Sequence, residues 1–133
     1  MGMKRKGYLL LILFVFLCPQ QVCGTEKPIL ISRITVTAGY EEHTLTRNYT
    51  SEEKIETVLG YLYKLNETGR ARIDPEQLTG IRHHVTVWMS DGSFRTYRIR
   101  DCRYLSKGCG PWKTLDYGQA SLLMPMLYLL PSD

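Results

Sequence analysis

The feature that most restricts the fold is an Asp-Gly pair between two segments in which apolar and polar residues alternate. Asp91 and Gly92 separate the run 84–89 from the run 94–105. Alternation with a period of two is typical of a strand that buries one face, and Asp-Gly suits the positive φ angles of a type I′ turn. The sequence therefore predicts a β-hairpin, and with it an antiparallel sheet.

A two-residue turn in this hairpin would place Trp88 opposite Arg95, with Tyr97 on the same face. An arginine beside an indole and a phenol is typical of a recognition surface, so we predict a protein-binding face of Trp88, Arg95 and Tyr97. Two alternatives remain open. Trp88 is an ordinary core residue beneath the connection 66–80, or a longer turn exchanges the two faces and moves Trp88 into the core.

Basic residues gather on the second strand of the hairpin and after it. Four of them form a candidate anion-binding site: Arg98, Arg100, Arg103 and Lys107. Arginine forks suit phosphate and carboxylate groups, which makes an anionic envelope polymer the alternative partner. Because neighbouring strand residues point to opposite faces, about half of this cluster can face one ligand. A solvated strand edge protected by charge explains the same residues without a ligand.

Two further segments have the features of helices. The capping box Thr50–Glu53 precedes apolar residues at helical spacing as far as Leu65, and a second helix begins at Asp116 and is kinked or broken at Pro125. With strands predicted at 33–38 and 43–49, the order is ββαββα. This order fits a two-layer α+β fold, with two helices on one face of an about four-stranded antiparallel sheet. The other face is left to solvent or a partner.

The first 24 residues have the form of a secretory signal peptide: a basic start, the apolar run Tyr8–Cys18, and a cleavage site ending at Gly24. The run is shorter than the roughly 20 residues that cross a bilayer. Leucine precedes Cys18 and valine precedes Cys23, whereas a lipidated cysteine follows a small residue, so we do not expect lipidation. We therefore predict one secreted domain, 25–133. Three basic residues leave with the signal, so the formal charge falls from +4 to +1. The mature chain then lacks the overall basic charge that is typical of nucleic-acid-binding proteins.

Cleavage would leave Cys102 and Cys109 in an oxidising compartment, which predicts a disulfide that closes a short loop. The alternative is a redox pair, but the turn from Cys109 to Trp112 lacks the second cysteine of such a motif. His83 and His84 are adjacent on a predicted strand, so their rings project to opposite faces and cannot share a metal ion.

The chain contains no motif that would predict an enzyme. It has no nucleophile elbow, no phosphate-binding loop and no separated pair of carboxylates, so we predict no catalytic residue, no cofactor and no metal. Asn48 and Asn66 begin N-glycosylation sequons, whose use depends on the source of the protein.

A resemblance that extends over most of the mature chain rests on six short segments: Ile34–Val36, Lys54–Leu62, Ser90–Tyr97, Arg103–Leu105, Trp112 and Leu130–Asp133. In this combination the chain resembles small secreted or envelope proteins of Gram-positive bacteria. The resemblance implies a location and an architecture but no functional residue. Together with the exposed sheet face, it leads us to expect a secreted, non-enzymatic binding or accessory domain. The oligomeric state is left open.

Overall fold

The computed structural model describes residues 28–40 and 42–133. The predicted signal peptide, residues 1–24, lies outside the described residues. Within the described part, the elements follow in the order β1 (Ile31–Tyr40), β2 (His43–Tyr49), α2 (Glu52–Lys64), β3 (Glu67–Arg70), the 3₁₀ turn η2 (Pro75–Gln77), β4 (Arg82–Met89), β5 (Phe94–Arg100), β6 (Tyr104–Lys107), β7 (Lys113–Leu115) and α3 (Tyr117–Leu129).

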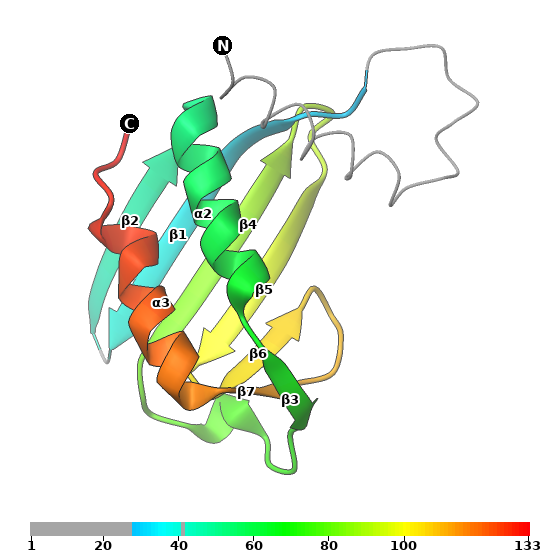
Figure 1. Ribbon diagram of the computed structural model, residues 1–133, viewed down its shortest axis with the longest axis vertical. Helices are drawn as coiled ribbons and strands as arrows, with labels where there is room; N and C mark the ends of the chain where they lie inside the picture. The colour runs from blue at the N-terminus through cyan, green and yellow to red at the C-terminus, as the bar shows by residue number, and fades with distance from the viewer. Residues whose placement is uncertain (1–27, 41) are drawn as a thin grey trace.

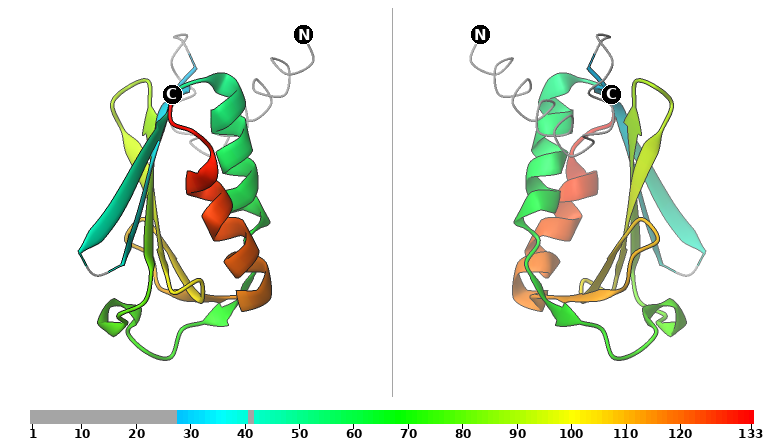
Figure 2. Two further views of the ribbon diagram at one scale, coloured as in Figure 1. Left: turned by 90° about the vertical axis from the view of Figure 1, so that its left-hand side faces the viewer. Right: turned by 90° about the vertical axis from the view of Figure 1, so that its right-hand side faces the viewer.

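The strands form one seven-stranded sheet in the order β2-β1-β4-β5-β6-β7-β3, and every pair of neighbours is antiparallel. Helices α2 and α3 lie side by side on one face of this sheet (Figure 1, Figure 2). The prediction of a four-stranded sheet in ββαββα order is therefore wrong. The fold is a strand-rich α+β arrangement of seven antiparallel strands and two helices.

Three strands, β3, β6 and β7, were not predicted, and in each case the local sequence or backbone explains why. The extended run after Gly92 does not continue to Leu105, because Asp101 and Cys102 adopt positive φ angles of 55° and 54°. The chain turns back there, and its continuation pairs with β5 as the separate strand β6. Strands β3 and β7 are three or four residues long, and all residues of β3 are exposed. Such short strands show no alternation for a sequence pattern to detect.

The core lies between the sheet and the two helices. The apolar stripe predicted for the first helix is confirmed, since α2 buries Ile55, Val58, Leu59 and Leu62. Its N-cap is Ser51 rather than Thr50, because the Ser51 hydroxyl accepts the hydrogen bond from the backbone N–H of Lys54. Helix α3 continues past Pro125 as one helix and buries Ala120, Met124 and Leu127.

The hairpin forms where predicted, but with a three-residue turn. Backbone N–H of Met89 donates to the carbonyl of Ser93 at 2.8 Å, and Gly92 takes the positive φ of 90° that closes such a turn. Trp88 consequently pairs with Phe94, and Arg95 pairs with Val87. The buried residues of β4 keep Trp88 on the outer face of the sheet, as in the prediction. The extra turn residue therefore exchanges the two faces of β5 only.

Candidate functional site

The candidate site is the open face, the sheet face that α2 and α3 leave uncovered (Figure 2). Trp88 projects to it, because its strand neighbours Val87 and Met89 are buried on the helix side. Arg33 on β1 and Phe94 on β5 lie beside Trp88 in the same cross-strand row. These three residues, Arg33, Trp88 and Phe94, form the aromatic end of the open face.

The side chains of the aromatic end pack on one another. The Trp88 and Phe94 ring centroids are 5.1 Å apart, and Cζ of Arg33 lies 5.1 Å from the centre of the Trp88 ring. The indole N–H of Trp88 donates to the Thr35 hydroxyl at 3.3 Å, and that hydroxyl donates to the side-chain oxygen of Asn48 at 2.8 Å. Trp88 is thus held in place and half-buried, while Phe94 keeps 57% of its surface exposed.

The middle of the open face is polar. It carries the strand residues that alternate with the buried core positions, and most of these are threonines: Thr35, Thr37, Thr44, Thr46, Thr86 and Thr96. Threonine suits a half-buried pleated surface without adding charge. The aromatic end therefore adjoins a broad neutral area.

Two of the predicted anion-binding residues lie at the other end of the open face. The segment 71–81 passes on the side of the sheet opposite to the helices and brings η2 to this place (Figure 2). From η2, Glu76 pairs with Arg98 at 2.9 Å and with Arg100 at 2.8 Å. Cζ of Arg98 and Cζ of Arg100 lie 4.8 Å and 5.5 Å from the ring centre of Trp112. These four residues form the basic end.

The other two predicted anion-binding residues lie elsewhere. Arg103 pairs with Asp101 at 3.4 Å, and its Cζ lies 4.1 Å from the ring centre of Tyr117, at the start of α3. Lys107 pairs with Glu67 at 2.8 Å. The structure therefore does not gather Arg98, Arg100, Arg103 and Lys107 into one site.

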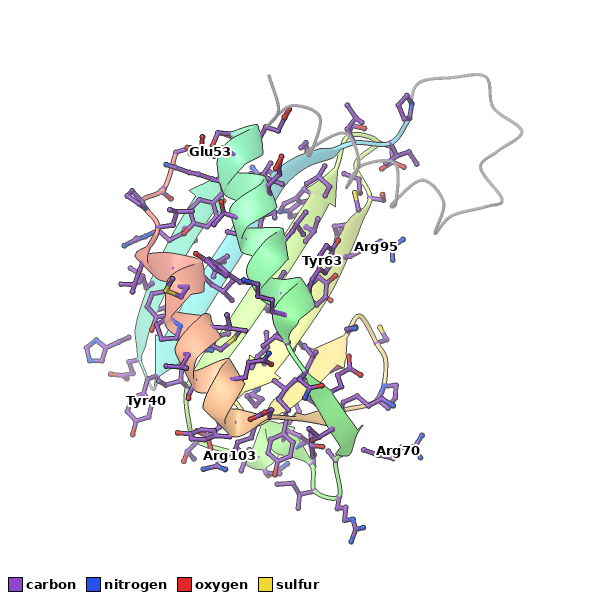
Figure 3. The ribbon with its side chains drawn as sticks, in the orientation of Figure 1. Tyr40, Glu53, Tyr63, Arg70, Arg95 and Arg103 are labelled. Atoms are coloured by element: carbon purple, nitrogen blue, oxygen red, sulfur yellow. The ribbon has the colours of Figure 1, made fainter. Side chains whose placement is uncertain are left out.

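The predicted face of Trp88, Arg95 and Tyr97 is also divided. Arg95 and Tyr97 are paired with Val87 and Val85, so they share the helix-covered face rather than the open one. Burial raises the pKa of Tyr97 there. Arg95 lies near Tyr63 at the end of α2 (Figure 3), and burial raises the pKa of Tyr63 to about 12.

The residues that replace them were missed for identifiable reasons. A two-residue turn would place Phe94, the neighbour of Arg95, on the face opposite to Trp88, whereas the three-residue turn of the structure brings Phe94 beside Trp88. Arg33 alternates with Ile34, which placed it on an outer face but gave no sign that β1 would neighbour Trp88. No pattern in the sequence brings Glu76 or Trp112 to β5.

The disulfide predicted between Cys102 and Cys109 is absent from the structure, in which both thiols are free. Cys102 lies in the turn before β6 and Cys109 in the turn after it. Four strand residues at about 3.3 Å each separate the two, whereas a disulfide joins Cα atoms less than about 7 Å apart. The six residues between the two cysteines include the strand β6 and do not form a closed turn.

The adjacent histidines of β4 lie on opposite faces of the sheet. His83 is buried on the helix side, where its ring stacks on Tyr128 with 5.7 Å between centroids. Burial lowers the pKa of His83 to about 4. His84 is on the open face, and its pKa is lowered first by partial burial and then by the charges of Arg100 and Arg98.

No helix in the described ranges has the length and apolar character needed to cross a membrane. Comparison with protein-family models, with curated proteins and with solved structures finds no match to this chain. The function must therefore be argued from the geometry of the open face.

Proposed function

We propose that this protein is a secreted, non-enzymatic binding domain that contacts a partner protein through the aromatic end of the open face. The observation that carries the proposal is the packing of Trp88 between Arg33 and the exposed Phe94 on a face that neither helix covers. Large aromatic side chains fixed at the surface offer contact area with little further loss of conformational entropy.

The chemistry of this surface suits a protein more than a small molecule. Tryptophan and arginine are enriched among the residues that contribute most to protein–protein binding, usually within a ring of weaker polar contacts. Here the threonine-rich middle of the sheet supplies such polar surroundings on one side. The face is a pleated surface rather than a deep cavity, and small molecules usually bind in cavities.

An anionic envelope polymer is the weaker proposal. Of the four basic residues predicted to bind it, two point away from the open face, and each of the four has a carboxylate partner in the chain itself: Glu76, Asp101 or Glu67. A polymer would have to replace these contacts at three separate places. Its binding would also weaken strongly with salt, which a contact centred on Phe94 and Trp88 would not.

Photo-crosslinking tests the proposed surface directly. A photoreactive benzoylphenylalanine at position 94, in protein mixed with the secreted and envelope proteins of its source, should yield a defined crosslinked partner. The matched control carries the same group in place of Leu122, an exposed apolar residue of α3 that is 75% exposed on the helix side. The crosslink should form only from position 94 and should persist at high salt. Equal crosslinking from both positions would refute the proposal.

A substitution pair gives the quantitative test. Phe94→Ala should weaken the identified complex by tenfold or more, because it removes the exposed ring that contacts Trp88. Leu122→Ala removes a comparable exposed apolar side chain from the opposite layer and should leave the affinity unchanged. An unchanged affinity of the Phe94→Ala protein would exclude the aromatic end as the contact surface.

A further inference from the structure

The basic end of the open face contains a pair of arginines that are held in position before any ligand binds. Arg98 and Arg100 are two residues apart on β5, so both side chains point to the same face. Both guanidinium groups lie over the ring of Trp112. The Arg98 and Arg100 side chains are only 27% and 13% exposed. Two positive charges are thus kept close together and partly removed from water.

A partly buried chain of hydrogen bonds fixes the orientation of Arg98. Its Nη2 group donates to the Ser106 hydroxyl at 3.0 Å, and this hydroxyl donates to the carbonyl of Gly110 at 2.9 Å. Ser106 is completely buried. The other terminal nitrogen of Arg98, Nη1, is thereby aimed at Glu76, to which it donates at 2.9 Å.

Glu76 satisfies this arginine pair incompletely. Its Oε2 accepts from Arg98 Nη1 and its Oε1 accepts from Arg100 Nη2, so each carboxylate oxygen serves one arginine. Among the described residues, no acceptor faces the buried Nε of Arg100. The Nε and Nη2 hydrogens of a guanidinium point the same way, as a fork for two oxygens. A third oxygen is therefore required to satisfy the three N–H groups.

We propose that Arg98, Arg100 and Trp112 form a binding site for a phosphate or sulfate group, which Glu76 occupies in the absence of ligand. A tetrahedral anion offers at least three oxygens, even as an ester: one for Arg98 Nη1 and two for the Nη2–Nε fork of Arg100. Phosphate also carries more negative charge than a carboxylate. The ligand is either the free anion or an ester on a larger molecule, and the chemistry of recognition is the same.

Glu76 is suited to give way to such a ligand. Its side chain is 42% exposed, and it extends from a three-residue turn that is held by the Asp74 cap and by the buried Pro75. The exposed Glu76 side chain can therefore swing away while Pro75 keeps the turn in place, and Trp112 and Ser106 continue to hold Arg98. The site is separate from the aromatic end, so it does not depend on the proposed protein partner.

Titration with inorganic phosphate tests the site, with the fluorescence of Trp112 as the signal. The protein carries Trp88→Phe, which leaves Trp112 as the single tryptophan and removes the indole of the aromatic end from the readout. Phosphate at pH 8 and constant ionic strength should change the emission in a saturable way. Glu76→Gln should bind phosphate at least tenfold more tightly than the parent, because the competing carboxylate charge is gone. Circular dichroism checks that each variant is folded.

Matched variants separate the site from a general effect of charge. Glu67→Gln removes the same charge from the Lys107 ion pair and should leave phosphate affinity unchanged. Arg100→Lys in the Glu76→Gln protein retains the charge but loses the fork, so affinity should fall by tenfold or more. Equal tightening by Glu67→Gln, or full binding by the Arg100→Lys protein, would overturn the proposal.

The choice of anion tests the three-oxygen argument and identifies the source. Sulfate should compete with phosphate, and acetate, with two oxygens, should not; equal competition by acetate would refute the argument. Phosphoserine that binds as tightly as phosphate would assign the site to esters, and loss of binding with the ester would assign it to the free anion. Failure of all anions in the Glu76→Gln protein would reject this site without affecting the crosslinking test of the aromatic end.

Discussion

The buried histidine of β4 should make this protein sensitive to mild acid. His83 is 2% exposed, and neither of its ring nitrogens has a hydrogen-bond partner among the described residues. Burial lowers its pKa from 6.5 to about 4 in the folded protein. The unfolded chain therefore binds a proton at His83 between about pH 6.5 and pH 4, while the folded chain does not. Stability should consequently fall as the pH falls through this window.

The size of the effect follows from the pKa difference. Each unit corresponds to about 1.4 kcal/mol, so a shift from 6.5 to about 4 predicts a loss of about 3 kcal/mol between neutral pH and pH 4. That is a large part of the 5–15 kcal/mol that is typical of the stability of a small domain. At neutral pH, the two unsatisfied nitrogens also carry a desolvation cost of about 1–3 kcal/mol each. His83→Leu should therefore be tolerated at pH 7 and should abolish the loss in acid.

Urea unfolding at several values between pH 7 and pH 4.5 measures both quantities in the parent protein and in His83→Leu. The pH-dependent difference between the two proteins is the informative value, because changes in the stacking on Tyr128 are the same at every pH and cancel. His43→Gln, at an exposed position, is the control for removal of a histidine. If the parent and His83→Leu lose stability with the same slope over this window, His83 is not the buried group that we describe.

Two further predictions concern the cysteines and the C-terminal segment. A thiol reagent should label Cys109 of the folded protein quickly and Cys102 slowly, because Cys109 is exposed whereas burial, with nearby Asp101, raises the pKa of Cys102; mass spectrometry showing no free thiol would contradict the structure. Asp133→Asn should lower the melting temperature at pH 7, because backbone N–H groups at the start of α2 and the ammonium of Lys54 hold the pKa of Asp133 below 3.8. That stabilisation is present above about pH 3.8 and is lost as the pH falls further, so the parent and the variant should converge in strong acid.

Local patterns predicted those elements whose signals lie within a few residues. The spacing of Ile55, Leu59 and Leu62 identified the core side of α2, and the alternation around Val85 and Val87 identified the core side of β4. Both signals are strong because a helix or strand that buries one side must repeat its apolar residues at the period of its backbone. The position of the hairpin turn at Gly92 was predicted from another local signal, the Asp-Gly pair between the two alternating segments.

The candidate site was less accessible to prediction. An Asp-Gly pair is compatible with turns of two or three residues, and one additional residue moved Arg95 and Tyr97 to the other face of the sheet. The turn between β5 and β6 has positive φ angles at Asp101 and Cys102. Glycine is the residue that usually marks such a conformation, and neither position is a glycine. The disulfide predicted from cysteine spacing is not present in the structure, because the strand β6 lies between Cys102 and Cys109.

The sequence by itself determined a chain with two amphipathic or apolar helices, an antiparallel hairpin at Gly92 and a sheet with one face left uncovered, because these depend on contacts between near neighbours and on simple periodicity. Only the tertiary structure decided that Arg33 and Phe94 flank Trp88, and that Glu76 bridges Arg98 and Arg100 above Trp112. Arg33 comes from a segment far from β4 in the chain and Glu76 from a segment far from β5, and Phe94 lies beside Trp88 only because the hairpin turn has three residues. Their meeting depends on strand order and on register to the single residue, which no local pattern encodes.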